Sequence, residues 1–161
     1  MITAIVCIIL LVLAAVLTFV SAAYGTAAAF LGLCVAGMLP GVELGAGTYM
    51  FWGVAMIIVI ALYFILPRSV STSRVGVPYI VTATLAGMLV GLAISHAAMI
   101  IGAVVAAVLG GVTYARTPQG AMLGFPSAKF WNYLCAKGLP AVIAFCTIGT
   151  AIPVLVEFFR V

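Results

Sequence analysis

The chain lacks the charged residues that cover the surface of a water-soluble protein. Only 5% of its 161 residues are charged, none is aspartate, and the mean hydropathy is +1.48. Soluble domains carry about 25% charged residues, so a surface this poor in charge would have little polar cover in water. Lipid as solvent removes that requirement. The sequence therefore predicts one integral membrane domain over residues 1–161, an all-α polytopic transmembrane helical bundle.

The residues that carry catalysis and metal binding are also scarce. The acids are Glu43 and Glu157, and His96 is the one histidine. A single histidine without nearby Asp, Glu or Cys makes no metal site. No Ser-His-Asp set, paired carboxylates or Gly-rich phosphate loop is present. We predict a non-enzymatic protein with no cofactor and no metal. Proton coupling is disfavoured too, because it needs an ionisable group inside a span.

The cysteines give no sign of a redox or metal motif. No two of them form a Cys-x-x-Cys pair, and all lie in or beside apolar stretches. They are Cys7, Cys34, Cys135 and Cys146. Buried cysteine usually packs as a small apolar residue, which is our interpretation. A disulfide or metal role is the alternative.

Six apolar segments approach the length that crosses a bilayer core of roughly 30 Å, about 20 residues. They are residues 2–21, 22–39, 49–66, 75–94, 97–115 and 138–158. Five of them are predicted to span. The second holds only 14 residues if it begins at Thr26, so it either spans from near Ala22 or is re-entrant. No cation precedes the first segment, so we expect a retained span and not a signal peptide.

The six cations are too scattered to form a nucleic-acid patch and instead flank the spans. Five lie in the loops 67–74 and 116–137. These five are Arg68, Arg74, Arg116, Lys129 and Lys137. Cytoplasmic loops are rich in Lys and Arg, so both loops are predicted to be cytoplasmic, with Arg160 as the exception. The N-terminus is then outside if the second segment spans and inside if it is re-entrant.

Residues 127–137 make up the main polar connection. Pro126-Ser127 predicts a helix start with Ser127 as the cap. Lys129 and Lys137 frame three aromatic residues, Trp131 among them, and Trp favours the headgroup region. The segment is interpreted either as a short interfacial helix or as an extension of the last span. In both cases Lys129, Trp131 and Lys137 are expected near lipid headgroups.

Small residues repeat every four positions in the fourth and fifth segments. The first stripe is Ala83, Gly87, Gly91 and Ser95, and the second is Ala98, Gly102, Ala106 and Gly110. A further stripe on the fifth segment is Ala103, Ala107, Gly111 and Ala115. Residues four apart share a helix face, and small residues let two backbones approach in lipid. With a turn at Ser95-His96, the pattern predicts an antiparallel glycine-zipper hairpin. This hairpin either packs within the protein, joins subunits or lines a pore.

Two single residues are candidate ligand or partner contacts. Glu43 sits in a Gly-rich loop, where it is either a solvated carboxylate or a contact for a cation or partner. His96 is either an ordinary loop histidine or a pH sensor, because histidine changes charge near neutral pH.

The run Ala36-Gly37-Met38-Leu39-Pro40-Gly41, followed by an apolar span and a Gly-rich hairpin, resembles a group of uncharacterised small bacterial integral membrane proteins. The resemblance covers residues 30 to 150. The chain departs from the group at Tyr114-Ala115-Arg116, where an acid is expected after the hairpin. The resemblance implies a bacterial inner-membrane protein of no known activity.

Three functions are compatible with these features. The leading hypothesis is a small membrane scaffold or assembly subunit, whose partners are the lipid bilayer, further copies of itself or other membrane subunits. The alternative is a small transporter or substrate-binding subunit for a neutral or apolar solute, with a cavity lined by polar side chains. The third is a pore-forming or lytic protein.

Overall fold

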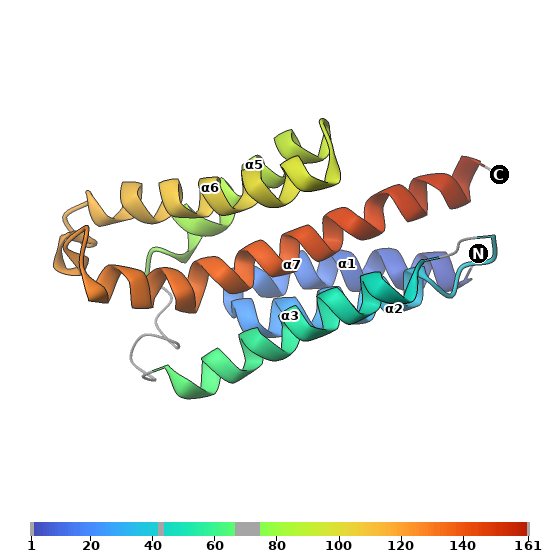
Figure 1. Cartoon of the computed structure of the whole chain (residues 1–161), viewed down its shortest axis with the longest axis horizontal. Coiled ribbons are helices and arrows are strands. Elements are labelled where there is room, and N and C mark those ends of the chain that lie inside the picture. The colour runs from blue at the N-terminus through green and yellow to red at the C-terminus, as the bar shows by residue number, and fades with distance from the viewer. Residues whose placement is uncertain (1, 42–43, 67–74, 161) are drawn as a thin grey trace.

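Most of the described residues are helical. The computed structural model describes residues 2–41, 44–66 and 75–160 (Figure 1). Within these ranges there are six α-helices, one 3₁₀ turn and no strand. The α-helices are α1 (Ile2–Val20), α2 (Ala22–Ala36), α3 (Ala46–Ile65), α5 (Val77–Leu92), α6 (His96–Ala115) and α7 (Ala128–Arg160). The 3₁₀ turn is η1 (Ala121–Leu123), between α6 and α7.

Successive helices alternate in direction along the long axis of the molecule, and both termini lie at the same end (Figure 1). α1 and α2 are joined through Ser21 alone, so they form a tight hairpin. Its contact face on α1 is the buried set Cys7, Leu11, Ala14 and Thr18, which share one side of the helix. A Cβ on Gly32 of α2 would lie 2.7 Å from Leu11 Cδ2, so the two helices approach closely there.

α7 is the central helix of the bundle. It contacts α1, α2, α3, α5 and α6, and it is buried from Phe130 to Val154 along most of its faces. α2 is tied to it by a hydrogen bond from the Thr26 hydroxyl to the Pro140 carbonyl oxygen, 3.1 Å. By contrast, α3 buries only Trp52 and Val59 and lies at the edge of the bundle. The fold is therefore organised around the last of its helices.

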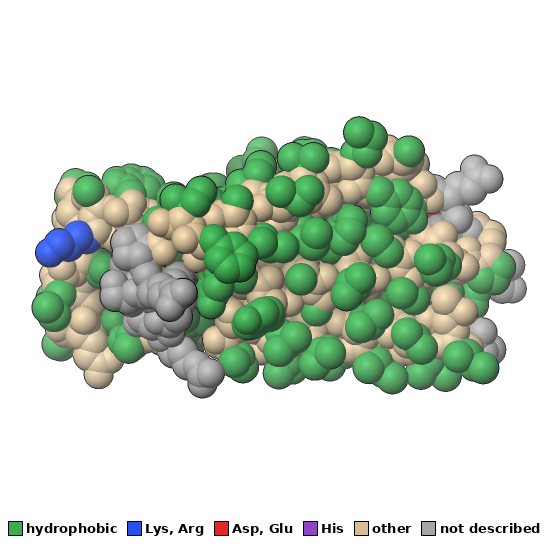
Figure 2. Space-filling view, turned by 90° about the horizontal axis from the view of Figure 1, so that it is seen from below, with side chains coloured by type: hydrophobic (Ala, Val, Ile, Leu, Met, Phe, Trp, Pro, Cys, Tyr) green, Lys and Arg blue, Asp and Glu red, His purple; other side chains and the backbone are tan. Residues whose placement is uncertain are grey.

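The outside of the bundle is apolar. Figure 2 shows hydrophobic side chains along most of the visible face and basic side chains at one end of it. Four helices are long and apolar enough to cross a membrane, namely α1, α3, α6 and α7, and α2 and α5 are shorter apolar helices. Within the described residues, the predictions of an all-helical protein and of helices long and apolar enough to cross a membrane are thus confirmed.

The final helix is longer than the predicted span. Residues 127–137 do not form a separate helix, because α7 continues without interruption from Ala128 to Arg160. The structure therefore agrees with the second interpretation, in which residues 127–137 extend the last apolar segment. The predicted cap is confirmed: the Ser127 hydroxyl oxygen accepts a hydrogen bond from the Phe130 N–H at 3.2 Å. At 1.5 Å per residue, the 33 residues of α7 reach about 50 Å, which exceeds a bilayer core of roughly 30 Å.

Candidate functional site

The first candidate site is the contact between α5 and α6, where the small residues meet. A Cβ on Gly102 would lie 2.5 Å from the Gly87 carbonyl oxygen. A Cβ on Gly110 would lie 2.6 Å from the Tyr79 carbonyl oxygen and 2.9 Å from Ala83 Cβ. A Cβ on Gly91 would lie 2.5 Å from Met99 Cα. The two backbones are therefore in contact along most of the hairpin, with no room for a side chain at these glycines.

The turn that joins the two helices is short and capped. α5 ends at Leu92 and α6 begins at His96. The Ser95 hydroxyl oxygen accepts a hydrogen bond from the Ala98 N–H at 3.1 Å, so one of the unpaired amides at the start of α6 is satisfied. Ser95 therefore acts as a helix cap in this turn.

The further stripe on α6 faces a different neighbour. Ala103, Ala107 and Ala115 are buried, and a Cβ on Gly111 would lie 3.2 Å from Leu134 Cδ1 of α7. On α7, a Cβ on Gly138 would lie 3.8 Å from Ala107 Cβ. α6 thus presents one small-residue face to α5 and another to α7.

The outer side of the α5–α6 contact is an open groove, which we call the hairpin groove. Its volume is about 510 Å³, and its lining side chains are all apolar. They are Ala83, Ala86, Gly87, Val90, Gly91, Ile94, Ala98, Ile101, Gly102 and Ala106. Ala86, Val90, Ile94 and Ile101 are exposed, while Gly102 and Ala106 are half-buried. The groove is therefore a shallow apolar channel floored by the small residues.

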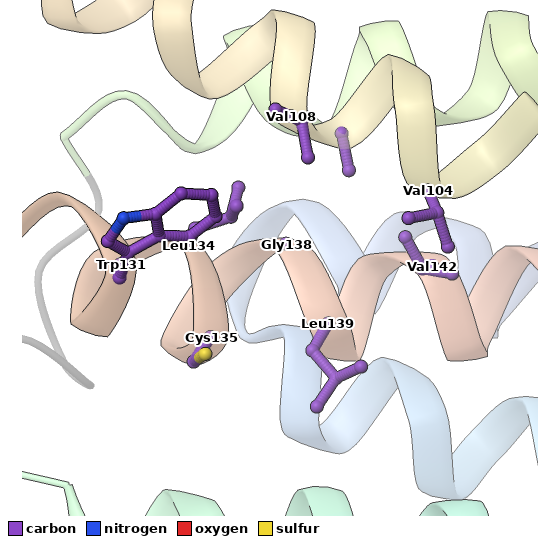
Figure 3. Close-up of a pocket in the computed structure, with 9 residues that line it drawn as sticks. Val104, Val108, Trp131, Leu134, Cys135, Gly138, Leu139 and Val142 are labelled. Atoms are coloured by element: carbon purple, nitrogen blue, oxygen red, sulfur yellow. The ribbon is translucent and has the colours of Figure 1, made fainter. Parts of the chain in front are cut away.

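A second groove lies between α6 and α7, and we call it the α6–α7 groove (Figure 3). Its volume is about 250 Å³. The lining residues are Val104, Ala107, Val108, Trp131, Leu134, Cys135, Gly138, Leu139 and Val142. Figure 3 shows Val104 and Val142 side by side at one end of the groove and the Trp131 ring at the other. Trp131 is 49% exposed, so this end opens on the surface.

A row of tyrosines at the start of α5 was not predicted from the sequence. The rings of Tyr114 and Tyr133 stack with centroids 5.6 Å apart, and Tyr79 lies 5.7 Å from Tyr114. The Tyr133 hydroxyl donates a hydrogen bond to the Val75 carbonyl oxygen at 2.6 Å. Gly76 passes beside these rings with φ +79°, a conformation that favours glycine. The row therefore joins the starts of α5 and α7 to the end of α6.

The predicted charged contacts fall in different surroundings. Glu43, Arg68 and Arg74 lie outside the described residues. His96 is exposed as the first residue of α6. Arg116 and Lys129 are exposed at the end where α6 stops and α7 starts.

Lys137 differs from the other cations because it is only 6% exposed. It follows Phe130, Tyr133 and Leu134 on the buried face of α7, at the spacing of a helical stripe. Its side chain therefore lies within the bundle and not in the headgroup region predicted for it, whereas the Lys129 side chain is exposed.

Several threonine hydroxyls bond within their own helices. Six threonine hydroxyls donate to backbone carbonyls one turn back in their own helices, at 2.6–2.8 Å. They belong to Thr18, Thr82, Thr84, Thr113, Thr147 and Thr150. The four cysteines are free thiols, and the described residues contain no cluster of three metal-ligating side chains.

Comparison of the chain with models of protein families, with curated proteins and with solved structures finds no match.

Proposed function

We propose that the chain is a non-enzymatic integral membrane protein that acts as a scaffold or subunit of a membrane assembly through small-residue helix packing. The observation that carries this proposal is the hairpin groove. Small residues at its floor let the α5 and α6 backbones touch, and the same residues leave a channel open on the outer side. In lipid, helices associate by close packing over small residues, because apolar side chains gain nothing by leaving lipid for protein.

The groove is suited to a helix from another chain. Its exposed rim is formed by Val90, Ile94 and Ile101, and its floor by Gly87 and Gly102. A ridge of side chains on a second helix fits such a channel, and the small floor brings the two backbones close. We therefore propose self-association or binding of a membrane partner through this glycine-zipper face.

The arrangement in the membrane is part of the proposal. We propose six spans in a bacterial cytoplasmic membrane, with the end of α6 and the start of α7 on the cytoplasmic side. Arg116 and Lys129 lie at this end, in accordance with the excess of basic residues in cytoplasmic loops. α2 contacts α7 and is joined to it by the hydrogen bond between Thr26 and Pro140, which favours a span over a re-entrant segment.

The two grooves favour assembly over transport of a neutral or apolar solute. A transport site was expected to be lined by polar side chains. The hairpin groove and the α6–α7 groove are apolar, and the six threonine hydroxyls noted above bond to carbonyls of their own helices.

The test is to fill the groove without opening the hairpin. Leucine at Gly87 or Gly102 would clash with the facing helix. A loss of association in these variants could then result from misfolding. Ala86 is exposed at the groove, so Ala86→Leu fills it from outside. Ala97→Leu, an exposed position that does not line the groove, is the matched control.

Association is measured by energy transfer between donor- and acceptor-labelled chains in vesicles, as a function of the protein-to-lipid ratio. We expect transfer in the unmodified chain, its loss in Ala86→Leu and its retention in Ala97→Leu, with equal melting temperatures in detergent. If energy transfer in the unmodified chain equals the value for randomly mixed chains, the protein does not self-associate. Equal energy transfer in Ala86→Leu and Ala97→Leu would show that the hairpin groove is not the contact surface.

A further inference from the structure

α3 lies at the edge of the bundle and is held there by few buried side chains. It contacts chiefly α2 and α7, and it lies across α7 from the α5–α6 hairpin (Figure 1). Of its 20 residues, Trp52 and Val59 are the two that are buried. α6 has the same length and buries seven residues. Most of the α3 surface is therefore left to lipid.

The start of α3 is fitted closely against α2. The Tyr49 ring lies against Gly37 at the end of α2, because a Cβ on Gly37 would overlap the Tyr49 hydroxyl. One turn further along α3, a Cβ on Gly53 would lie 3.4 Å from the Phe30 ring of α2, which is ordinary van der Waals contact. Ring and glycine therefore fix the position of this end.

The end of α3 meets α7 across a small gap in the packing, which we call the α3–α7 seam. A cavity of about 10 Å³ lies there. Its walls are Leu62, Tyr63 and Leu66 from the end of α3, and Cys135, Ala136 and Pro140 from α7. Between this cavity and the start of the helix, Val59 is the one fully buried contact of α3. The packing is therefore looser at the end of α3 than at its start.

The surrounding lipid makes this difference in packing decisive. Apolar side chains gain nothing by leaving lipid for protein, so close packing and interhelical hydrogen bonds hold a helix in a bundle. Within the part of the chain that the structure describes, no hydrogen bond joins α3 to another helix, whereas Thr26 bonds α2 to α7. Segments with few buried contacts open at a low free energy. The end of α3 can therefore separate from α7 at low cost.

We propose that α3 is a lateral gate. Its start stays fixed on α2 at Gly37, while its end moves away from α7 in the plane of the membrane and lets lipid acyl chains enter the α3–α7 seam. Val59 is the contact that this movement breaks. The gate takes α3 as a membrane helix, which belongs to the proposed function, but it does not involve the hairpin groove. Its failure would leave the test of association untouched.

The experiment measures distances across the bundle in lipid nanodiscs by pulsed electron paramagnetic resonance. In a chain whose four cysteines are alanine, one spin label is placed at Leu109→Cys on α6 and the other at Phe64→Cys at the end of α3. The controls pair Leu109→Cys with Met50→Cys at the start of α3, or with Tyr24→Cys on α2. All these positions are exposed. We expect a broad or two-peaked distance distribution for Phe64→Cys and a single narrow one for each control.

A pair of substitutions tests the contact that the gate breaks. Val59→Ala shortens a buried side chain, and Val54→Ala makes the same change at an exposed position of α3. Loss of buried methyl groups weakens packing, so Val59→Ala should raise the fraction of the longer distance severalfold. Val54→Ala should leave that fraction unchanged.

Amide hydrogen exchange gives a second measurement, on the chain without any substitution. The last two turns of α3 should exchange at least about tenfold faster than the last two turns of α6, because the buried contacts of α6 continue to its end. Equal exchange rates in the two helices would contradict the gate. This comparison can refute the proposal even if the cysteine-free chain fails to fold.

Two results of the distance measurement would also overturn the proposal. A distribution for Phe64→Cys as narrow as that for Tyr24→Cys would show that the end of α3 is fixed. Equal broadening for Met50→Cys and Phe64→Cys would show that the whole helix is displaced, without an anchor at Gly37.

Discussion

Gly87 and Gly102 lie backbone to backbone, because a Cβ on Gly102 would be 2.5 Å from the Gly87 carbonyl oxygen. We predict that Gly102→Ala lowers the stability of the protein by about 1–3 kcal/mol, the usual cost of overpacking. Gly53→Ala on α3 is the control, since its Cβ would meet Phe30 at an ordinary 3.4 Å. There alanine should be neutral or stabilising by up to about 1 kcal/mol through helix propensity. Thermal unfolding in detergent compares the two, and equal shifts would contradict the close contact.

The hydrogen bond between α2 and α7 gives a second prediction. Thr26→Val removes the hydroxyl that donates to the Pro140 carbonyl oxygen at 3.1 Å, and we expect a loss of about 0.6–1.7 kcal/mol, as for other interhelical hydrogen bonds in membranes. Thr84→Val is the control, because this equally buried hydroxyl donates within its own helix to Ile80. The melting temperature should fall more for Thr26→Val. A greater fall for Thr84→Val would be the opposite of this expectation.

The tyrosine row gives a third prediction. Tyr133→Phe keeps the ring stacked on Tyr114 and removes the hydrogen bond to the Val75 carbonyl oxygen, 2.6 Å. We expect a loss of about 0.5–1.5 kcal/mol and faster hydrogen exchange in the first turn of α5. Tyr24→Phe, at a ring that is 64% exposed, should change neither quantity. Exchange that is unchanged at the start of α5 would show that the bond does not hold this end.

Orientation in the membrane can be measured with two cysteines on opposite ends of α6 and α7. Ala97 and Ala128 are both exposed and follow the Ser95 turn and the Ser127 cap. In a chain without Cys34 and Cys135, a membrane-impermeant maleimide on intact cells should label Ala97→Cys and not Ala128→Cys. Both should react after permeabilisation. The reverse pattern would place the basic end outside.

The same method decides whether α2 spans. Ser21 is the only residue between α1 and α2, so it marks one end of both helices. If α2 spans, Ser21→Cys lies on the cytoplasmic side and is protected in intact cells. If α2 is re-entrant, Ser21→Cys is labelled from outside. The packing of α2 beside α7 leads us to expect protection.

The sequence predicted which parts of the chain are helical better than it predicted their neighbours. The expected segment 97–115 is α6 within one residue, and Ser127 caps α7 as expected. Composition and length suffice for this, because a helix that can cross a bilayer is long and apolar and forms its backbone hydrogen bonds internally. The number of spans and the zipper role of the small residues stay predictions.

The central position of α7 could not be predicted in this way. Lipid and protein interior are equally apolar, so hydropathy does not tell a face that meets a helix from a face that meets lipid. Lys137 shows the difficulty: its charge indicated the headgroup region, and its place on the Phe130–Tyr133 face put it inside. The tyrosine row was missed for a related reason, since Tyr79, Tyr114 and Tyr133 come from three helices and have no local pattern.

The order of the helices along the chain has a consequence for biogenesis. α7 is translated after all five helices that it contacts. At about 5–20 residues per second, its 33 residues take about 2–7 s to synthesise. During that interval the faces of the earlier helices that contact α7 are without this partner. The hydrogen bond between the Thr26 hydroxyl and the Pro140 carbonyl oxygen therefore forms only after the last helix has been made.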